Sequence, residues 1–142
     1  MNSYSDKIII TTGDPNGIGA EITIKALNRL DLPEDKIVLI SNRKIIDYYG
    51  AFNKNYEIIE IPYEDEVRPG EITEYAGEFS YQSLKKVCEI KPKAIVTAPV
   101  AKNAMHLAGH IYRPNRYVVF PPHACGNLRS PSRILNQAMQ TV

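Results

Sequence analysis

The beginning of the chain combines a short buried strand, a glycine-rich turn and an amphipathic helix. Residues 7–12 read Lys-Ile-Ile-Ile-Thr-Thr, an apolar run of strand length, and residues 20–30 have the apolar spacing of a helix. Between them, residues 13–19 contain three glycines. This order places backbone N–H groups and a positive helix end at the carboxyl edge of a sheet, where open α/β proteins bind phosphates and nucleotides. A tight turn without a ligand is the alternative.

Within this turn, five residues are candidates for cofactor binding. We expect Gly13 to leave the strand with a positive φ, and Gly17 and Gly19 to let a ligand or a neighbouring strand approach the backbone. Ile18 lies between them. Asp14 could bind a ribose hydroxyl, or could instead form an Asx turn with its own backbone. The spacing G-x-x-x-G-x-G differs from the dinucleotide fingerprint, and no acidic residue ends a second strand about 20 residues further on.

The rest of the chain to residue 112 alternates between strand and helix patterns. Apolar runs predict three further strands, and periodic segments between them predict helices, with Asn42 able to cap one and Gly50 able to end it. This alternation predicts an α/β fold with a mainly parallel sheet. The strands are expected at 36–41, 56–61 and 94–98, and the helices at 42–49, 71–89 and 102–107.

Three segments resemble 4-hydroxythreonine-4-phosphate dehydrogenases, in the order that this family shows. The opening motif is Ile-Ile-Thr-Thr-Gly-Asp-Pro-Asn-Gly-Ile-Gly-Ala-Glu at 9–21. Pro-Gly-Glu-Ile at 69–72, followed by residues 76–84, is similar to a glycine-preceded helix of the family. Residues 94–102 resemble its Thr-Gly-Pro-Val-x-Lys strand and loop, with Ala98 in place of the usual glycine. The resemblance covers residues 7 to about 112.

The resemblance implies a fold, an activity and partners. It implies the N-terminal part of an isopropylmalate/isocitrate dehydrogenase-like fold, and NAD-dependent oxidation and decarboxylation of 4-phosphohydroxy-L-threonine in vitamin B6 synthesis by a homodimer. A divalent metal assists in the family, but its ligands lie beyond the matching segment, so we expect no metal ligands and no complete catalytic set here. Lys102, after the last predicted strand, is the candidate for a substrate phosphate or carboxylate. A solvated loop lysine is the alternative.

Two other classes of protein remain open. The chain could be a non-catalytic remnant or binding module that binds an anion or nucleotide weakly through residues 13–19. It could also be related to phosphate-acyl transferases, which share the superfamily fold. Asp14 with Pro15, and the pattern of residues 69–84, favour the dehydrogenase.

Composition gives no indication of nucleic acid or a membrane as partner. The net charge is +1, and no apolar run approaches the roughly 20 residues of a membrane helix. The two cysteines fit no disulfide or metal framework, so a reducing cytoplasm is expected, with Cys88 in the core. His106 and His110 are four residues apart, but a metal site needs a third ligand, and we expect surface histidines instead.

The character of the chain changes after residue 112. Residues 1–112 hold all 16 acidic residues and all ten lysines, whereas residues 113–142 have four arginines and neither lysine nor acid. Back-translation of residues 112–117, read one nucleotide later, allows Thr-Gly-Gln-Thr-Asp, close to the family's Thr-Gly-His-Thr-Glu motif. We therefore expect a partial dehydrogenase-like domain at 1–112 and an irregular, out-of-frame or disordered tail at 113–142.

Overall fold

The computed structural model describes residues 4–110, and also the backbone of residues 119–120. These residues form a five-stranded sheet in the order β3-β2-β1-β4-β5. The four strands before residue 110 are parallel, and β5 runs antiparallel to β4. In chain order the elements are β1 (Ile8–Thr11), α1 (Gly19–Arg29), η1 (Glu34–Lys36), β2 (Ile37–Ser41), α2 (Arg43–Tyr49), β3 (Glu57–Glu60), α3 (Glu74–Ile90), β4 (Ala94–Thr97), α4 (Lys102–Leu107) and β5 (Val119–Phe120).

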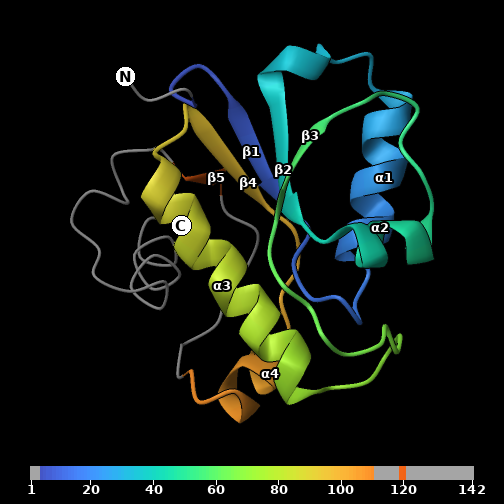
Figure 1. Cartoon of the computed structure of the whole chain (residues 1–142), viewed down its shortest axis with the longest axis vertical. Coiled ribbons are helices and arrows are strands. Elements are labelled where there is room, and N and C mark those ends of the chain that lie inside the picture. The colour runs from blue at the N-terminus through green and yellow to red at the C-terminus, as the bar shows by residue number, and fades with distance from the viewer. Residues whose placement is uncertain (1–3, 111–118, 121–142) are drawn as a thin grey trace.

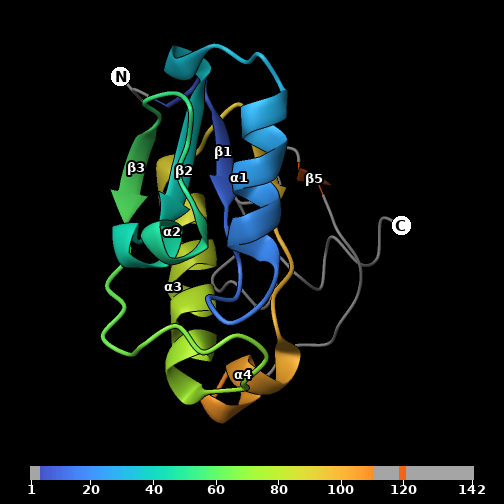
Figure 2. The ribbon, with the colours of Figure 1, turned by 90° about the vertical axis from the view of Figure 1, so that its right-hand side faces the viewer.

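Helices cover both faces of the sheet. α1 and α2 lie on one face, and α3 crosses the other, with α4 packed near the first turns of α3 (Figures 1 and 2). The predicted mainly parallel α/β fold is thereby confirmed. None of the helices among the described residues is long and apolar enough to cross a membrane.

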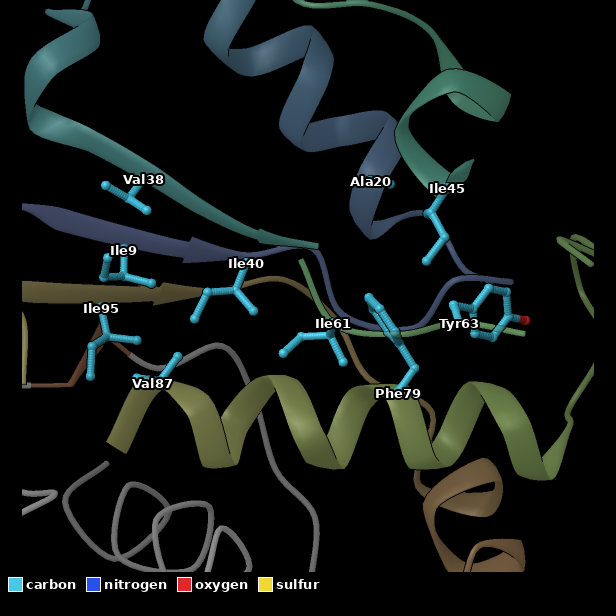
Figure 3. Close-up of a cluster of buried hydrophobic side chains, with 10 residues drawn as sticks. All are labelled: Ile9, Ala20, Val38, Ile40, Ile45, Ile61, Tyr63, Phe79, Val87 and Ile95. Carbon is cyan, nitrogen blue, oxygen red and sulfur yellow. The ribbon is translucent and has the colours of Figure 1, made fainter. Parts of the chain in front are cut away.

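The core between the sheet and α3 is built from alternate residues of the strands. Ile9, Ile40 and Ile95 point toward Phe79 and Val87 of α3 (Figure 3). The intervening residues of β2 face the other way, into a smaller cluster with Leu27 of α1. All five residues of β2 are buried, as expected for a parallel strand covered on both faces.

Capping residues set the ends of two helices. The Asn42 side chain accepts a hydrogen bond from the amide of Lys44 at 3.0 Å, and Gly50 follows the last turn of α2, as predicted. α3 begins at Glu74 and not at the predicted residue 71, because the hydroxyl of Thr73 accepts the amide of Ala76 and caps the helix there. Thr73 and Ala76 are only three residues apart, so this cap can be recognised in the sequence. The Pro-Gly-Glu-Ile pattern at 69–72 instead indicated an earlier start of the helix.

The predicted tail falls mostly outside the described residues. Of the tail predicted at 113–142, the structure does not describe residues 113–118 and 121–142. The backbone of Val119–Phe120 pairs with Ile95 and Val96 of β4.

Candidate functional site

Two glycines of the turn after β1 are required by their backbone surroundings. Gly13 has φ +73°, in the region that favours glycine, and a Cβ there would overlap the carbonyl oxygen of Pro99. Gly19 has no positive φ, but a Cβ would overlap the carbonyl oxygen of Thr12. The turn therefore packs closely against the end of β1 and against the loop after β4.

Gly17 is different, because neither its φ nor the described residues around it require a glycine there. A Cβ would meet its nearest atoms, the Cβ and carbonyl oxygen of Asp14, at 3.5 Å, an ordinary van der Waals separation. The neighbouring Ile18 is 56% exposed and gives α1 no side-chain cap. The first amides of α1 lack intrahelical acceptors, so this end of the helix suits an anion.

Asp14 is buried beneath the turn. Asp14 is only 4% exposed. Its Oδ1 accepts a hydrogen bond from the amide of Asn16 at 2.7 Å, which forms an Asx turn. Burial raises the pKa of Asp14, and the nearby backbone amides, that of Asn16 first, oppose this rise only in part. The role of Asp14 in cofactor binding stays a prediction.

Asn16 connects the turn to the segment that leads into α3. Its Oδ1 accepts the amide of Arg68 at 2.8 Å, and its Nδ2 donates to the carbonyl of Glu71 at 3.2 Å. Its own carbonyl accepts the amide of Gly70 at 2.8 Å. Asn16 has no local pattern in the sequence that marks this role, since its partners lie 52 or more residues away.

Tyr49 supports the turn, whereas Tyr63 donates to the carbonyl of Glu66. The Tyr49 hydroxyl, at the end of α2, donates to the carbonyl of Pro15 at 2.7 Å. Tyr63, after β3, has its pKa raised to about 12, first by burial and then by the charges of Asp65 and Asp14. Burial is also the main cause that raises the pKa of Tyr49. At neutral pH both hydroxyls therefore stay protonated and can act as donors.

The structure brings residues 94–102, the last of the three segments that resemble the family, next to the turn. The amide of Asp14 donates to the Pro99 carbonyl at 3.0 Å, and the loop continues into α4, whose first residue is the exposed Lys102. Within the described ranges Lys102 makes no ion pair. Its predicted role toward an anion is not tested by these contacts.

The two histidines of the described chain have different surroundings. His110 stacks on Tyr81, with ring centroids 3.5 Å apart, and its Nε2 lies 2.6 Å from Oε2 of Glu78. This attaches the end of α4 to α3, so His110 is not the surface histidine that the sequence suggested. His106 is exposed. Among residues 4–110 no group of three His, Cys, Asp or Glu side chains could hold a metal ion.

A separate hollow of about 360 Å³ lies beside α3. Its lining includes Tyr63, Tyr75 and Phe79, with Glu64 and Glu78 at its sides. The predicted site residues do not line it.

Comparisons with known proteins agree with the resemblance. No protein-family model matches the chain. D-threonate 4-phosphate dehydrogenase of Pectobacterium atrosepticum is 33% identical over 74% of this chain and 40% of its own length. 4-Hydroxythreonine-4-phosphate dehydrogenase of Synechococcus sp. is also 33% identical, over 75% of this chain and 36% of its own.

Solved structures give the same result for the fold. The 4-hydroxythreonine-4-phosphate dehydrogenase of Klebsiella pneumoniae superposes with a TM-score of 0.69 at 28% identity, over 78% of this chain and 42% of that one. The enzyme of Burkholderia phymatum gives a TM-score of 0.65 at 27% identity, over 79% and 42%. The chain thus spans about two fifths of the length of the relatives that it matches. Over about three quarters of its own length, it is a partial relative of the 4-hydroxythreonine-4-phosphate and D-threonate 4-phosphate dehydrogenases.

Proposed function

We propose that this chain is part of an NAD-dependent dehydrogenase of a phosphorylated hydroxy acid, and that it contributes an anion-binding turn to that enzyme. The substrate class follows from the relatives' names, which include both 4-hydroxythreonine 4-phosphate and D-threonate 4-phosphate. These compounds share a phosphate and an alcohol on a four-carbon acid. Oxidation of 4-phosphohydroxy-L-threonine in vitamin B6 synthesis is the reaction that the resemblance favours, with a homodimer as the assembly.

One observation carries the proposal. Gly17 is half-buried, a Cβ there would make only ordinary van der Waals contact with Asp14, and neither its φ nor its described neighbours require glycine. A ligand that needs close approach to the backbone explains this choice, because the fold alone does not. The phosphates of NAD fit such a position, since the uncapped first turn of α1 offers amide donors there.

The residues of the turn would bind and orient NAD, and would not take part in the hydride transfer itself. Amides of Ile18 and Gly19 would donate to a phosphate, and Lys102 would supply a positive charge from the adjacent loop. When bound, NAD supplies the acceptor for the hydride that leaves the substrate alcohol. Gly13 and Gly19 allow the turn after β1 and the loop after β4 to pack closely together.

The metal of the family does not fit the described residues. They contain no cluster of three possible ligands, so no step of the reaction is assigned to a metal here. We infer that these residues alone do not complete a catalytic site. The non-catalytic binding module stays the second candidate, favoured by the same missing cluster.

Binding and turnover measured together test the proposal. The amides of Gly17, Ile18 and Gly19 should shift when ¹⁵N-labelled chain is titrated with NAD or pyrophosphate, and uncharged nicotinamide should leave them unmoved. Lys102→Gln should weaken the binding of pyrophosphate, and Lys25→Gln, at an exposed site on α1, should not. An absence of shifts at these amides would refute the proposed site. Chelator-sensitive reduction of NAD by the chain with 4-phosphohydroxy-L-threonine would refute the inference of an incomplete site.

We also propose that residues 113–142 arise from a change of reading frame near codon 112. The loss of lysine and acid there, together with the Thr-Gly-Gln-Thr-Asp reading, supports this. Resequencing the coding DNA should show an open frame, one nucleotide later, that continues with dehydrogenase-like segments. Early stop codons in that frame would refute the idea.

A further inference from the structure

Asn16 is a buried asparagine directly before Gly17. It is only 4% exposed, whereas asparagine side chains lie mostly at the surface of proteins. Its side chain carries an acceptor oxygen and two donor hydrogens, and a buried polar group without a partner destabilises the fold. The burial of Asn16 therefore depends on partners within the protein.

Its side-chain partners all come from one segment, residues 68–73, which lies between β3 and α3. The Oδ1 of Asn16 accepts the amide of Arg68 at 2.8 Å. The Nδ2 donates to the carbonyl of Glu71 at 3.2 Å and to the hydroxyl of Thr73 at 3.4 Å. The oxygen and the nitrogen of this side chain are thus both bound to the same segment.

The backbone of Asn16 is held as well. Its carbonyl accepts the amide of Gly70, from the same segment, at 2.8 Å. The next amide, that of Gly17, donates to the carbonyl of Asp14 at 3.1 Å. The Asn16 carbonyl and the Gly17 amide belong to one planar peptide group. This peptide group therefore cannot rotate unless both hydrogen bonds break.

The surroundings of Asn16 argue against direct contact with a ligand. Its side chain is buried, and its oxygen and nitrogen already bind residues 68–73. The amides that we propose as donors to an anion, those of Ile18 and Gly19, follow directly after the fixed peptide group. An effect of Asn16 on binding must therefore act through the conformation of the turn.

We propose that Asn16 is a positioning residue, which attaches the glycine-rich turn to residues 68–73 and so fixes the amides of Ile18 and Gly19 before an anion binds. Donors that are already ordered bind more tightly, because no ordering of the backbone opposes binding. The functional meaning of this rests on the proposed anion-binding turn, but the attachment itself does not.

Asn16→Ala removes the side-chain hydrogen bonds and leaves the backbone groups in place. The matched control is Asn28→Ala, in the last turn of α1. The Asn28 side chain makes the same pair of contacts, since it accepts the amide of Asn53 at 2.8 Å and donates to the carbonyl of Ala51 at 2.9 Å. Both variants should unfold at lower urea concentrations.

Only Asn16→Ala should also bind pyrophosphate more weakly. We expect a loss of about tenfold in affinity, the effect of having to order one backbone residue on binding. Unchanged affinity in N16A would overturn the proposal. An equal loss in N16A and N28A would overturn it too, because the loss would then follow from general destabilisation.

The amide of Gly17 reports the order of the turn directly. Its hydrogen exchange should be about tenfold faster in N16A than in the wild type and unchanged in N28A, because only N16A releases the peptide group that carries this amide. Saturating pyrophosphate should slow this exchange more in N16A than in the wild type, since the ligand then has to order the turn. Unchanged exchange at Gly17 in N16A would refute the attachment.

Asn16→Asp tests the donor alone, and it also serves if Asn16→Ala does not fold. Aspartate keeps an oxygen for the amide of Arg68, but an ionised carboxylate cannot donate to the carbonyl of Glu71. Lower pH protonates the carboxyl and restores a donor. The exchange rate at Gly17 in N16D, divided by that of the wild type at the same pH, should therefore fall toward one as the pH is lowered. A ratio that does not change with pH would overturn the proposal.

Binding and exchange together keep this proposal apart from the proposed function. Wild type that does not bind pyrophosphate contradicts the proposed function, and exchange at Gly17 then still decides whether Asn16 holds the turn. Wild type that binds, combined with faster exchange but equal affinity in N16A, overturns the positioning role and leaves the proposed function in place.

Discussion

Substitution by alanine should lower the stability of the protein at Gly19 but not at Gly17, two residues before it. In Gly19→Ala the new Cβ would lie well under 3.0 Å from the carbonyl oxygen of Thr12, a separation that real Cβ atoms essentially never show. The obstacle is backbone at the end of β1, so it cannot rotate away as a side chain would. Overpacking of this kind costs about 1–3 kcal/mol. Alanine in place of glycine in a helix returns up to about 1 kcal/mol.

The net loss expected for Gly19→Ala is therefore about 2 kcal/mol, which is the upper part of the overpacking range less the helix term. Gly17→Ala is the matched control, because its Cβ would meet Asp14 at an ordinary 3.5 Å. Its stability should equal the wild type or exceed it by about 0.4–1 kcal/mol, since alanine restricts the unfolded chain. In Gly17→Ala we expect weaker binding of pyrophosphate without a loss of stability.

Urea denaturation measures the stability of both variants, and far-UV circular dichroism can follow the unfolding. Tyrosine fluorescence is a second probe, since the chain has nine tyrosines and no tryptophan. With a slope of about 2 kcal/mol per molar urea, the midpoint of Gly19→Ala should fall by about 1 M. A midpoint equal to the wild type would show that the turn can open without cost. A clear loss of stability in Gly17→Ala would show that this glycine serves the fold, and would remove the observation behind the proposed site.

Three further predictions concern stability. Tyr56→Phe removes a buried hydroxyl that has no partner among the described residues, so the free energy of unfolding should stay the same or rise by up to about 1 kcal/mol. A clear fall in the urea midpoint would show that the hydroxyl has a partner. Lys91→Gly relieves a φ of 46° after α3 and should raise stability by roughly 0.5–1 kcal/mol, whereas a lower midpoint would contradict this. Partial burial raises the pKa of Glu78, but hydrogen bonds from Gln82 and His110 outweigh it and lower the pKa below 4.5. Its stabilisation should therefore be complete above pH 4.5 and be lost as the pH falls through the folded value, and Glu78→Gln should lack this loss in acid unfolding curves.

Local patterns were sufficient for most of the elements. The apolar run at residues 36–41 predicts a buried strand, which is β2 in the structure, and Asn42 and Gly50 mark the ends of α2. The strand, glycine-rich turn and helix at the start predict which edge of the sheet carries the site. These features depend on residues within a few positions of one another, because strand and helix periodicity and capping act over one or two turns of chain. The resemblance to the dehydrogenases could be read from the same segments.

Tertiary structure decided how the turn is held and which of its residues face outward. Tyr49 reaches Pro15 across 34 residues, and Asn16 reaches Arg68 across 52. The amide of Asp14 donates to the carbonyl of Pro99 at 3.0 Å, which ties the turn to the loop after β4. Such pairs have no periodic signal, because they form only when the parallel strands bring successive loops to one edge of the sheet. The difference between a glycine that the fold requires and one that it leaves open is likewise set by which distant backbone approaches it.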